Sequence, residues 1–116
     1  MNNGHHLILD LYDCDQEILD DYNYLSDMLR DAVSISGANL IRMCGEHFEP
    51  QGVTVLALLS ESHASIHTWP CQGYAAVDLY TCNPSGTDSQ RAAEFIRQKL
   101  KCVDSEQKFI ERKIAK

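Results

Sequence analysis

Four strand-like segments follow one another with only short connections in the middle of this chain. They cover residues 38–48, 53–60, 63–69 and 73–82. Proline and glycine, which often build turns, lie between them at Pro50, Gly52, Pro70 and Gly73. Consecutive strands with short connections pair antiparallel, because a parallel pair needs a long crossover. The middle of the chain therefore predicts an antiparallel sheet.

Two segments outside this region repeat their apolar residues at helical spacing. The first is predicted to begin at Asp15 as its N-cap and to stop at Gly37, and the second covers residues 89–101. The side chains predicted to face inward are Ile18, Tyr22, Leu25, Leu29 and Ala32 in the first helix, and Ala92, Phe95, Ile96 and Leu100 in the second.

Strands at 5–12 and 107–114 complete the order β-α-β-β-β-β-α-β. Two amphipathic helices then cover one face of an antiparallel sheet, which predicts an α+β two-layer sandwich. The other sheet face needs a cover, and a second subunit is one answer. The unbroken apolar run at 53–60 predicts a strand that is buried on both faces. At 116 residues the chain is expected to form one domain.

The formal net charge of −7 argues against nucleic acid or an anionic membrane as a partner, because both require a basic surface. No apolar run approaches the ~18 residues that a membrane span needs, and the first ten residues lack the features of a signal peptide. The five cysteines form no CxxC pair and are interpreted as reduced thiols. We therefore expect a cytoplasmic protein.

Residues 61–69, ESHASIHTW, concentrate polar side chains directly after the apolar run. For any one of these residues, a solvated sheet face or a turn is the simpler explanation. The cluster as a whole calls for a further explanation, because polar groups at the end of a buried strand must find hydrogen-bond partners. A metal site, a serine nucleophile and a reaction with the chain's own backbone are the chemistries to compare.

The first two chemistries fit poorly. His63, His67 and Cys71 are spaced four apart and would share one face of a helix, but the segment favours a strand and Pro70 would break the helix. No further ligand is spaced for a tetrahedral site, so no metal is predicted. A hydrolase elbow needs G-x-S-x-G, whereas an acid and an imidazole flank Ser62.

Self-modification makes different demands. A serine hydroxyl can attack the preceding carbonyl to give an ester, and a base that removes the serine α-proton then eliminates the upstream chain. The product hydrolyses to a pyruvoyl group. This needs a strained turn before the serine, a donor to the oxyanion and a nearby imidazole. Ser62, in a turn between two strands, with His67 returning on the following strand, can meet these demands.

Longer motifs support this third chemistry. The segment SESHASIHTWP, followed by GYAAVDLYTC, resembles the signature of the small prokaryotic S-adenosylmethionine decarboxylases, which are pyruvoyl enzymes of polyamine synthesis. GHHLILDLYDCDQEILDD is similar to the family's first strand and helix, and HFEPQGVTVLALLSESH to its approach to the processing site. The resemblance covers residues 4–83 well and the remainder loosely.

The resemblance implies self-cleavage between Glu61 and Ser62. Ser62 would become the pyruvoyl group, which forms a Schiff base with the substrate amine, so neither pyridoxal phosphate nor a metal is expected. Cleavage would leave a β chain of residues 1–61 and an α chain of residues 62–116. A homodimer of cleaved protomers is also expected, with residues of both subunits near each site.

Four further residues match family positions. His67 matches the processing base, and Thr54 falls where a hydroxyl assists processing. Cys82 matches the acid that reprotonates the substrate carbon after CO₂ leaves. Phe48 falls where an aromatic ring stacks on adenine.

One position departs from the family pattern, because Cys71 stands where a glutamate is thought to hold the ribose hydroxyls. A thiol replaces a carboxylate poorly as a hydrogen-bond acceptor. S-adenosylmethionine, a cationic small molecule, remains the default substrate. The first alternative keeps the chemistry but acts on a basic amino acid, ornithine or arginine. The second is a non-catalytic regulatory paralogue.

Overall fold

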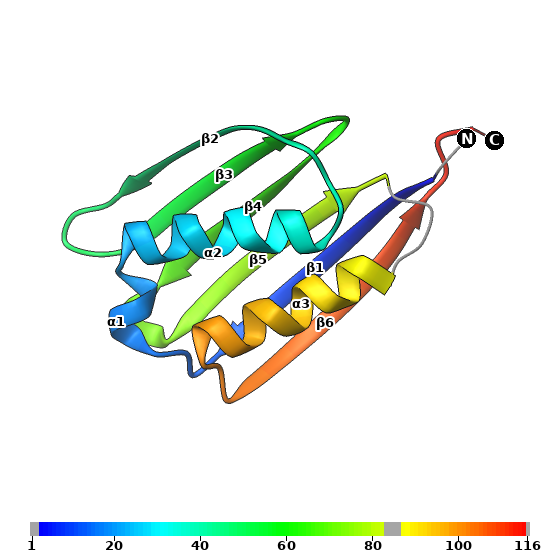
Figure 1. Ribbon diagram of the computed structural model, residues 1–116. Coiled ribbons are helices and arrows are strands. Elements are labelled where there is room, and N and C mark those ends of the chain that lie inside the picture. Colours follow the sequence, from blue (N-terminus) through cyan, green and yellow to red (C-terminus); the bar gives the residue numbers. More distant parts are fainter. Residues whose placement is uncertain (1–2, 83–86, 116) are drawn as a thin grey trace.

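A single antiparallel sheet forms one layer of the molecule in the computed structural model, which describes residues 3–82 and 87–115 (Figure 1). Its strands are β1 (Gly4–Tyr12), β2 (Leu40–His47), β3 (Val53–Leu59), β4 (Ser62–Trp69), β5 (Tyr74–Thr81) and β6 (Asp104–Arg112). They lie side by side in the order β2-β3-β4-β5-β1-β6. The run from β2 to β5 therefore follows the chain, as the short connections predict, and β1 lies between β5 and β6.

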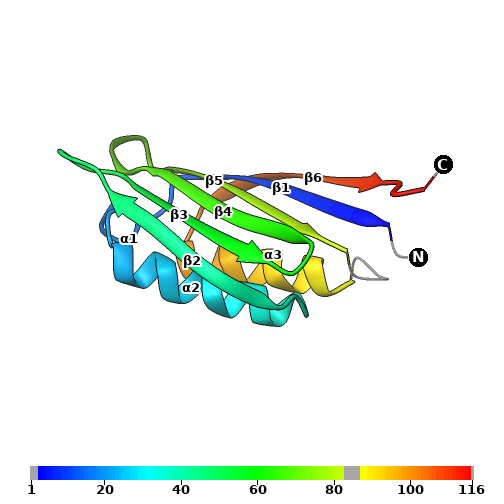
Figure 2. The ribbon, with the colours of Figure 1, turned by 90° about the horizontal axis from the view of Figure 1, so that it is seen from above.

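The helices form the second layer. They are α1 (Gln16–Leu19), α2 (Tyr22–Ile35) and α3 (Thr87–Leu100), and a short 3₁₀ helix, η1 (Pro70–Gln72), links β4 to β5. Figure 2 shows α2 and α3 on the same side of the sheet, which confirms the predicted two-layer α+β sandwich. The core lies between the layers, where alternate strand residues such as Leu7, Leu9, Ile66 and Leu79 are at most 1% exposed.

The predicted first helix is in fact two helices. Asp15 caps α1 as expected, but Asp21 caps α2, and each carboxylate accepts a hydrogen bond from the backbone amide three residues on. The second cap starts a new helix where the apolar stripe predicts a continuous one. Gly37 follows the end of α2 with φ of 80°, a conformation that favours glycine.

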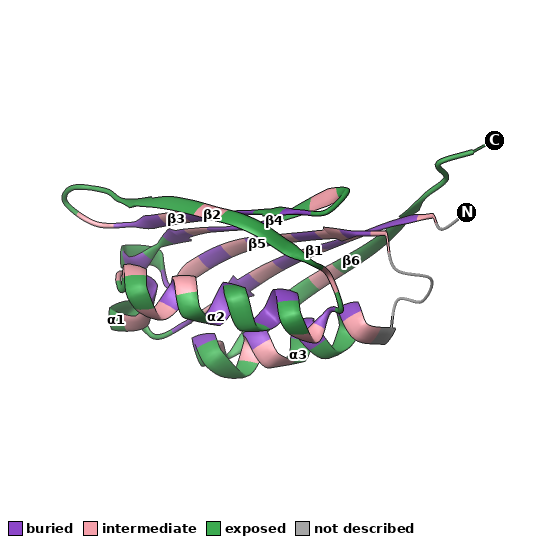
Figure 3. Cartoon of the chain, turned by 45° about the horizontal axis from the view of Figure 1, so that its top comes forward, coloured by how far each residue is buried: buried purple, intermediate pink, exposed green. Residues whose placement is uncertain are grey.

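The prediction that β3 is buried on both faces is wrong for the single chain. Its side chains alternate between buried and solvent-facing positions, and Leu56 and Leu58 are 44% and 49% exposed. The helices cover only the inner face of the sheet, so the outer face is open to solvent. Figure 3 shows β2 exposed along most of its length.

The last two elements follow the sequence closely. In α3, Ala92, Ile96 and Leu100 are buried as predicted, and Phe95 packs partly against the core. Strand β6 begins three residues before the predicted strand and pairs with β1 at the sheet edge. The predicted loop at 83–88 lies mostly outside the described residues. In the described part of the chain, no helix is long and apolar enough to cross a membrane.

Candidate functional site

The two-residue turn between β3 and β4 has an unfavourable backbone. Ser60 and Glu61 form this turn, and Glu61 adopts φ of 72°. Two-residue hairpin turns favour a positive φ at the first central residue, whereas Ser60 is not among the described residues with positive φ. A left-handed conformation costs a residue such as glutamate about 1–2 kcal/mol. The turn therefore holds Glu61, the residue before Ser62, in a strained backbone conformation.

Cys82 reaches this turn from the end of β5. Its Sγ donates a hydrogen bond of 3.8 Å to the carbonyl oxygen of Glu61, which belongs to the peptide bond that precedes Ser62. A pocket of about 190 Å³ opens beside them. It is lined by Gly37, Ala38, Asn39, Ser60, Glu61, Ser62 and Cys82. Three of the predicted site residues, Glu61, Ser62 and Cys82, thus come together here.

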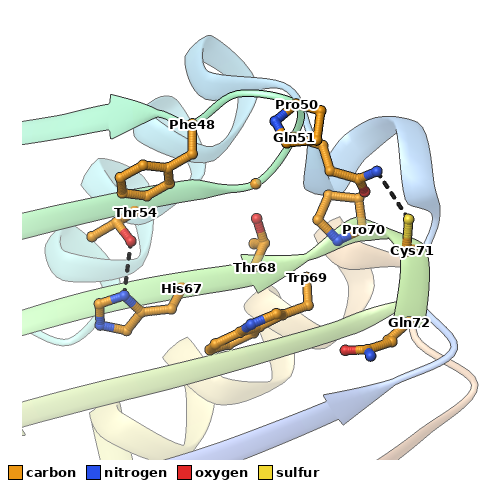
Figure 4. A pocket seen from close by; sticks show the side chains of 11 residues that line it. Phe48, Pro50, Gln51, Thr54, His67, Thr68, Trp69, Pro70, Cys71 and Gln72 are labelled. Atoms are coloured by element: carbon orange, nitrogen blue, oxygen red, sulfur yellow. Dashed lines mark hydrogen bonds between the residues drawn. The ribbon is translucent and has the colours of Figure 1, made fainter.

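The opposite end of the β3–β4 hairpin holds a second group of predicted residues. Thr54 and His67 are direct partners in the β3–β4 register, and Thr54 Oγ1 lies 2.9 Å from His67 Nδ1. Both side chains are on the outer sheet face, at the edge of a pocket of about 470 Å³ (Figure 4). The residues matched separately to the processing histidine and to the assisting hydroxyl therefore lie in contact.

Aromatic rings and uncharged polar groups line this larger pocket. Phe48 and Trp69 are 47% and 46% exposed, and Trp69 also stacks on Tyr74 at 5.2 Å between ring centroids. In the view of Figure 4, Gln51 and Cys71 lie at the other end of the pocket from His67. Gln51 Nε2 donates to Cys71 Sγ at 2.9 Å.

The two groups are separated within one chain. Ser62 and His67 lie on the same strand, β4, and five residues of extended chain span about 16 Å. The expectation that the chain's own return brings His67 beside Ser62 is therefore wrong, because the turn precedes Ser62 and both residues follow it. The structure brings Cys82 to Glu61 and Thr54 to His67, but it does not bring these two pairs together.

Two residues of the larger pocket, Trp69 and Gln51, carry no role in the sequence prediction. Trp69 is an obvious candidate in retrospect, because it is the chain's one tryptophan and continues the outward alternation of His63 and His67. Gln51 lies in a turn, where a polar residue is ordinary. Only the fold shows that this turn approaches η1.

A carboxylate anchors the turn that carries Gln51. Asp20 Oδ1 accepts hydrogen bonds from the Gly52 amide at 2.9 Å and from His47 Nε2 at 2.8 Å. The hydrogen bond from the Gly52 amide is the main cause that holds the pKa of Asp20 below its ordinary value. Burial opposes this shift, and the contact with His47 adds to it. Asp20 is the residue at which α1 ends, so the helix break also fixes one wall of the pocket.

The five cysteines are all free, and they differ in setting. Burial raises the pKa of the Cys14 thiol to about 12, and the neighbouring Cys102 adds to the shift. Burial also raises the pKa of Cys102. These two thiols pack at the core, whereas Cys82 and Cys71 line pockets. Among the described residues, no group of three or more histidine, cysteine, aspartate or glutamate side chains is arranged to hold a metal ion.

Known proteins resemble this chain over most of its length. The pattern of the S-adenosylmethionine decarboxylase family matches residues 5–113. The S-adenosylmethionine decarboxylase proenzyme of a Synechococcus species is 50% identical over 101 residues, which cover 87% of this chain and 78% of the relative. A proenzyme of the same name from Methanococcus aeolicus is 53% identical over 79 residues, 68% of each chain.

Solved structures agree. The crystal structure of the adenosylmethionine decarboxylase from Aquifex aeolicus superposes with a TM-score of 0.89 at 33% identity, covering 99% of this chain and 94% of that one. A monomer of the Trypanosoma brucei AdoMetDC shares the fold at a TM-score of 0.60 and 14% identity, covering 89% of this chain and 44% of that one. The chain belongs to the S-adenosylmethionine decarboxylase family, an enzyme family of pyruvoyl-dependent carboxy-lyases.

Proposed function

We propose that this chain cleaves itself between Glu61 and Ser62 and then decarboxylates S-adenosylmethionine for polyamine synthesis. The observation that carries the proposal is the contact of Cys82 Sγ with the Glu61 carbonyl oxygen, at a turn where Glu61 has φ of 72°. A strained residue next to the bond to be broken, and a donor to the oxygen that gains charge, favour an attack by the next side chain.

The cleavage chemistry follows from these positions. Ser62 Oγ attacks the Glu61 carbonyl carbon, the C–N bond breaks, and the Glu61 acyl group moves from nitrogen to oxygen. While charge develops on the Glu61 oxygen, Cys82 donates to it. A base then removes the Ser62 α-proton, and the Cβ–Oγ bond breaks to release Glu61 as a carboxylate. Addition of water and loss of ammonia leave a pyruvoyl group, with a β chain of residues 1–61 and an α chain of 62–116.

His67 is the proposed base, and its contact with Thr54 supports that role. If Thr54 Oγ1 accepts from Nδ1–H, the other ring nitrogen, Nε2, is unprotonated and can take a proton. The hydroxyl thereby fixes both the tautomer and the direction of the ring. His67 lies about 16 Å from Ser62 in the same chain, so the base must come from a second copy.

The outer face of the sheet is suited to such a copy. Ser62 and His67 lie on either side of the middle of β4, near Ser65. A two-fold axis through the outer face at this point would bring His67 of each copy to the end of β4 that carries the Glu61–Ser62 bond in the other. Leu56 and Leu58, exposed on this face beside an apolar groove of about 350 Å³, would be buried by the contact. We therefore propose a homodimer with two composite sites.

The residues that surround Ser62 fit a pyruvoyl group, because its precursor bond is held by Cys82 beside an open pocket. When present, that group supplies a carbonyl that takes up an amine and draws electrons from the bond to the leaving CO₂. Cys82 then gives its Sγ proton to the substrate carbon. A thiol carries one S–H proton, and a positioned side chain of this kind can act as a general acid.

The larger pocket supports a nucleoside-bearing substrate. Phe48 and Trp69 offer ring faces on which a flat heterocycle can stack. Of the described residues that line this pocket, none is acidic. Ornithine or arginine would place a cationic end there without a carboxylate partner, which is unfavourable. The basic amino acids are therefore the less supported substrates.

Intact mass and product assays test the proposal. Purified protein should give two masses that correspond to residues 1–61 and to 62–116 with a pyruvoyl end. It should release CO₂ from S-adenosylmethionine, and not from ornithine or arginine supplied in parallel. An uncleaved chain with serine at position 62 would refute the cleavage step, and CO₂ from the amino acids alone would refute the substrate.

A further inference from the structure

The larger pocket has a polar end that the proposed chemistry leaves unused. Its polar side chains there are the amides of Gln51 and Gln72 and the thiol of Cys71. Thr54 and His67 contact each other at the opposite end. A substrate that fills this pocket of about 470 Å³ would therefore meet uncharged groups at one end and the imidazole at the other.

The amide of Gln51 has a defined orientation. Its Nε2 donates to Cys71 Sγ at 2.9 Å, so the nitrogen is engaged. Among the described residues, Gln51 Oε1 has no hydrogen-bond partner, and Gln51 is only partly exposed. The backbone that carries it is anchored, because the next residue, Gly52, donates its amide to Asp20. The pocket thus presents a held amide oxygen, which is a good hydrogen-bond acceptor.

We propose that Gln51 is a specificity-determining residue that accepts, at Oε1, a hydrogen bond from a sugar hydroxyl of a nucleoside ligand. Cys71 is a positioning residue, because its sulfur engages Nε2 and turns the oxygen toward the ligand. This inference rests on the proposed function, since it assigns the part of the pocket that reads the nucleoside of the substrate.

The chemistry favours a neutral hydroxyl over a charged donor. A buried hydroxyl needs an acceptor, and thiol sulfur is a weak one, so Cys71 alone would leave the sugar poorly paired. An ammonium or guanidinium would need a carboxylate, and none of the described pocket residues supplies one. A neutral amide oxygen therefore suits a neutral diol better than it suits a cation.

Binding of adenosine and 2′,3′-dideoxyadenosine to the purified protein, measured by calorimetry, tests the assignment. Gln51→Ala should weaken adenosine about fivefold, the usual value of one neutral hydrogen bond, and leave the dideoxy compound unchanged. Gln98→Ala, which removes an exposed glutamine on α3, is the matched control and should change neither. Equal weakening of both compounds by Gln51→Ala, or of neither, would overturn the proposal.

The direction in which a second substitution changes the affinity for adenosine tests which amide atom of Gln51 faces the ligand. Gln51→Glu keeps the shape and makes the acceptor stronger, so adenosine should bind more tightly, while the dideoxy compound should not. Tighter binding of adenosine supports the oxygen-first orientation, and weaker binding would show that Nε2 faces the sugar and would overturn it. Cys71→Ser keeps a partner for Nε2 and should retain more affinity than Cys71→Ala.

Failure of the Gln51 assignment can be distinguished from failure of the proposed function. Self-cleavage and CO₂ release are measured on the same preparation by mass and by product. If cleavage or decarboxylation of S-adenosylmethionine fails while the Gln51 effect on adenosine persists, the reaction assignment falls and the Gln51 assignment stands. If decarboxylation is seen but KM for S-adenosylmethionine is the same in Gln51→Ala as in the parent, the Gln51 assignment falls alone.

Discussion

The two ends of the β3–β4 hairpin are built for different tasks. One end is a tight turn with left-handed Glu61, where Cys82 contacts the carbonyl oxygen of Glu61. The other is an open pocket with exposed aromatic rings, where Thr54 holds His67. One end has the bond that we propose is cleaved, and the other has the proposed base. The contrast teaches that a chain can carry a complete set of reactive groups and still keep them too far apart to react.

The largest expected effect is at the turn. Ser62→Ala removes the attacking hydroxyl, so cleavage and decarboxylation should both be lost completely, and intact mass should show one uncleaved chain. Thermal melting should show that the variant is folded. Cleavage in this variant would mean that the reacting bond has been assigned to the wrong end of the hairpin.

Complementation tests whether the two ends meet across a dimer. Ser62→Ala and His67→Ala chains, each inert alone, should form one competent site when produced together, because the proposed dimer brings His67 of one chain to the Glu61–Ser62 bond of the other. The His67→Ala chain, distinguished by its mass, should then be cleaved in mixed dimers. His63→Ala, a histidine on the same strand and face, is the matched control and should cleave itself. No cleavage in the mixture would confine the site to one chain.

Cys82 is expected to affect turnover more than cleavage. Cys82→Ala should lower kcat by about 10²–10⁴-fold, the usual contribution of a positioned acid. Self-cleavage should be only slowed, because strain at Glu61 remains. A time course of cleavage by gel, followed by CO₂ release per cleaved chain, separates the two effects. Equal losses in both would show that Cys82 acts only at the turn.

Thr54 should give the smallest effect, confined to the pocket end. Thr54→Val has the same shape without the hydroxyl, and loss of one orienting hydrogen bond of about 1.4 kcal/mol should slow self-cleavage about tenfold. Thr54→Ser keeps the hydroxyl and should cleave at nearly the parent rate. If valine and serine behave alike, the contact with His67 has no part in processing.

Much of the fold follows from local patterns. Short connections between apolar strands predict the antiparallel run from residue 38 to 82, and two amphipathic stripes predict the helices on one face. The break between α1 and α2 is not predictable in the same way. The apolar stripe continues across the break, so the cap at Asp21 does not stand out from it. The neighbouring Asp20 accepts a hydrogen bond from Gly52, 32 residues later, and this contact exists only in the folded chain.

The candidate site also has a part that the sequence predicts and a part that only the fold reveals. Glu61 and Ser62 are adjacent, and a motif can identify them. The contact of Cys82 with Glu61 spans 21 residues, and that of Gln51 with Cys71 spans 20, so both depend on strand register and loop placement. The apolar run likewise predicts that both faces of β3 are buried, but it does not identify what covers the outer face. Leu56 and Leu58 are exposed because that cover belongs to another molecule in our proposal.

The strand order has a further consequence for a chain that is cut at residue 61. The first piece would keep β1, β2 and β3, and the second β4, β5 and β6, yet β1 lies between β5 and β6. The pieces are interleaved, and three of the five strand pairings join one piece to the other. Cleavage would therefore leave the fold intact, because neither piece can dissociate without breaking the strand pairings of the sheet. Once unfolded, however, the protein must reassemble from two polypeptides, so refolding of the mature enzyme should depend on its concentration.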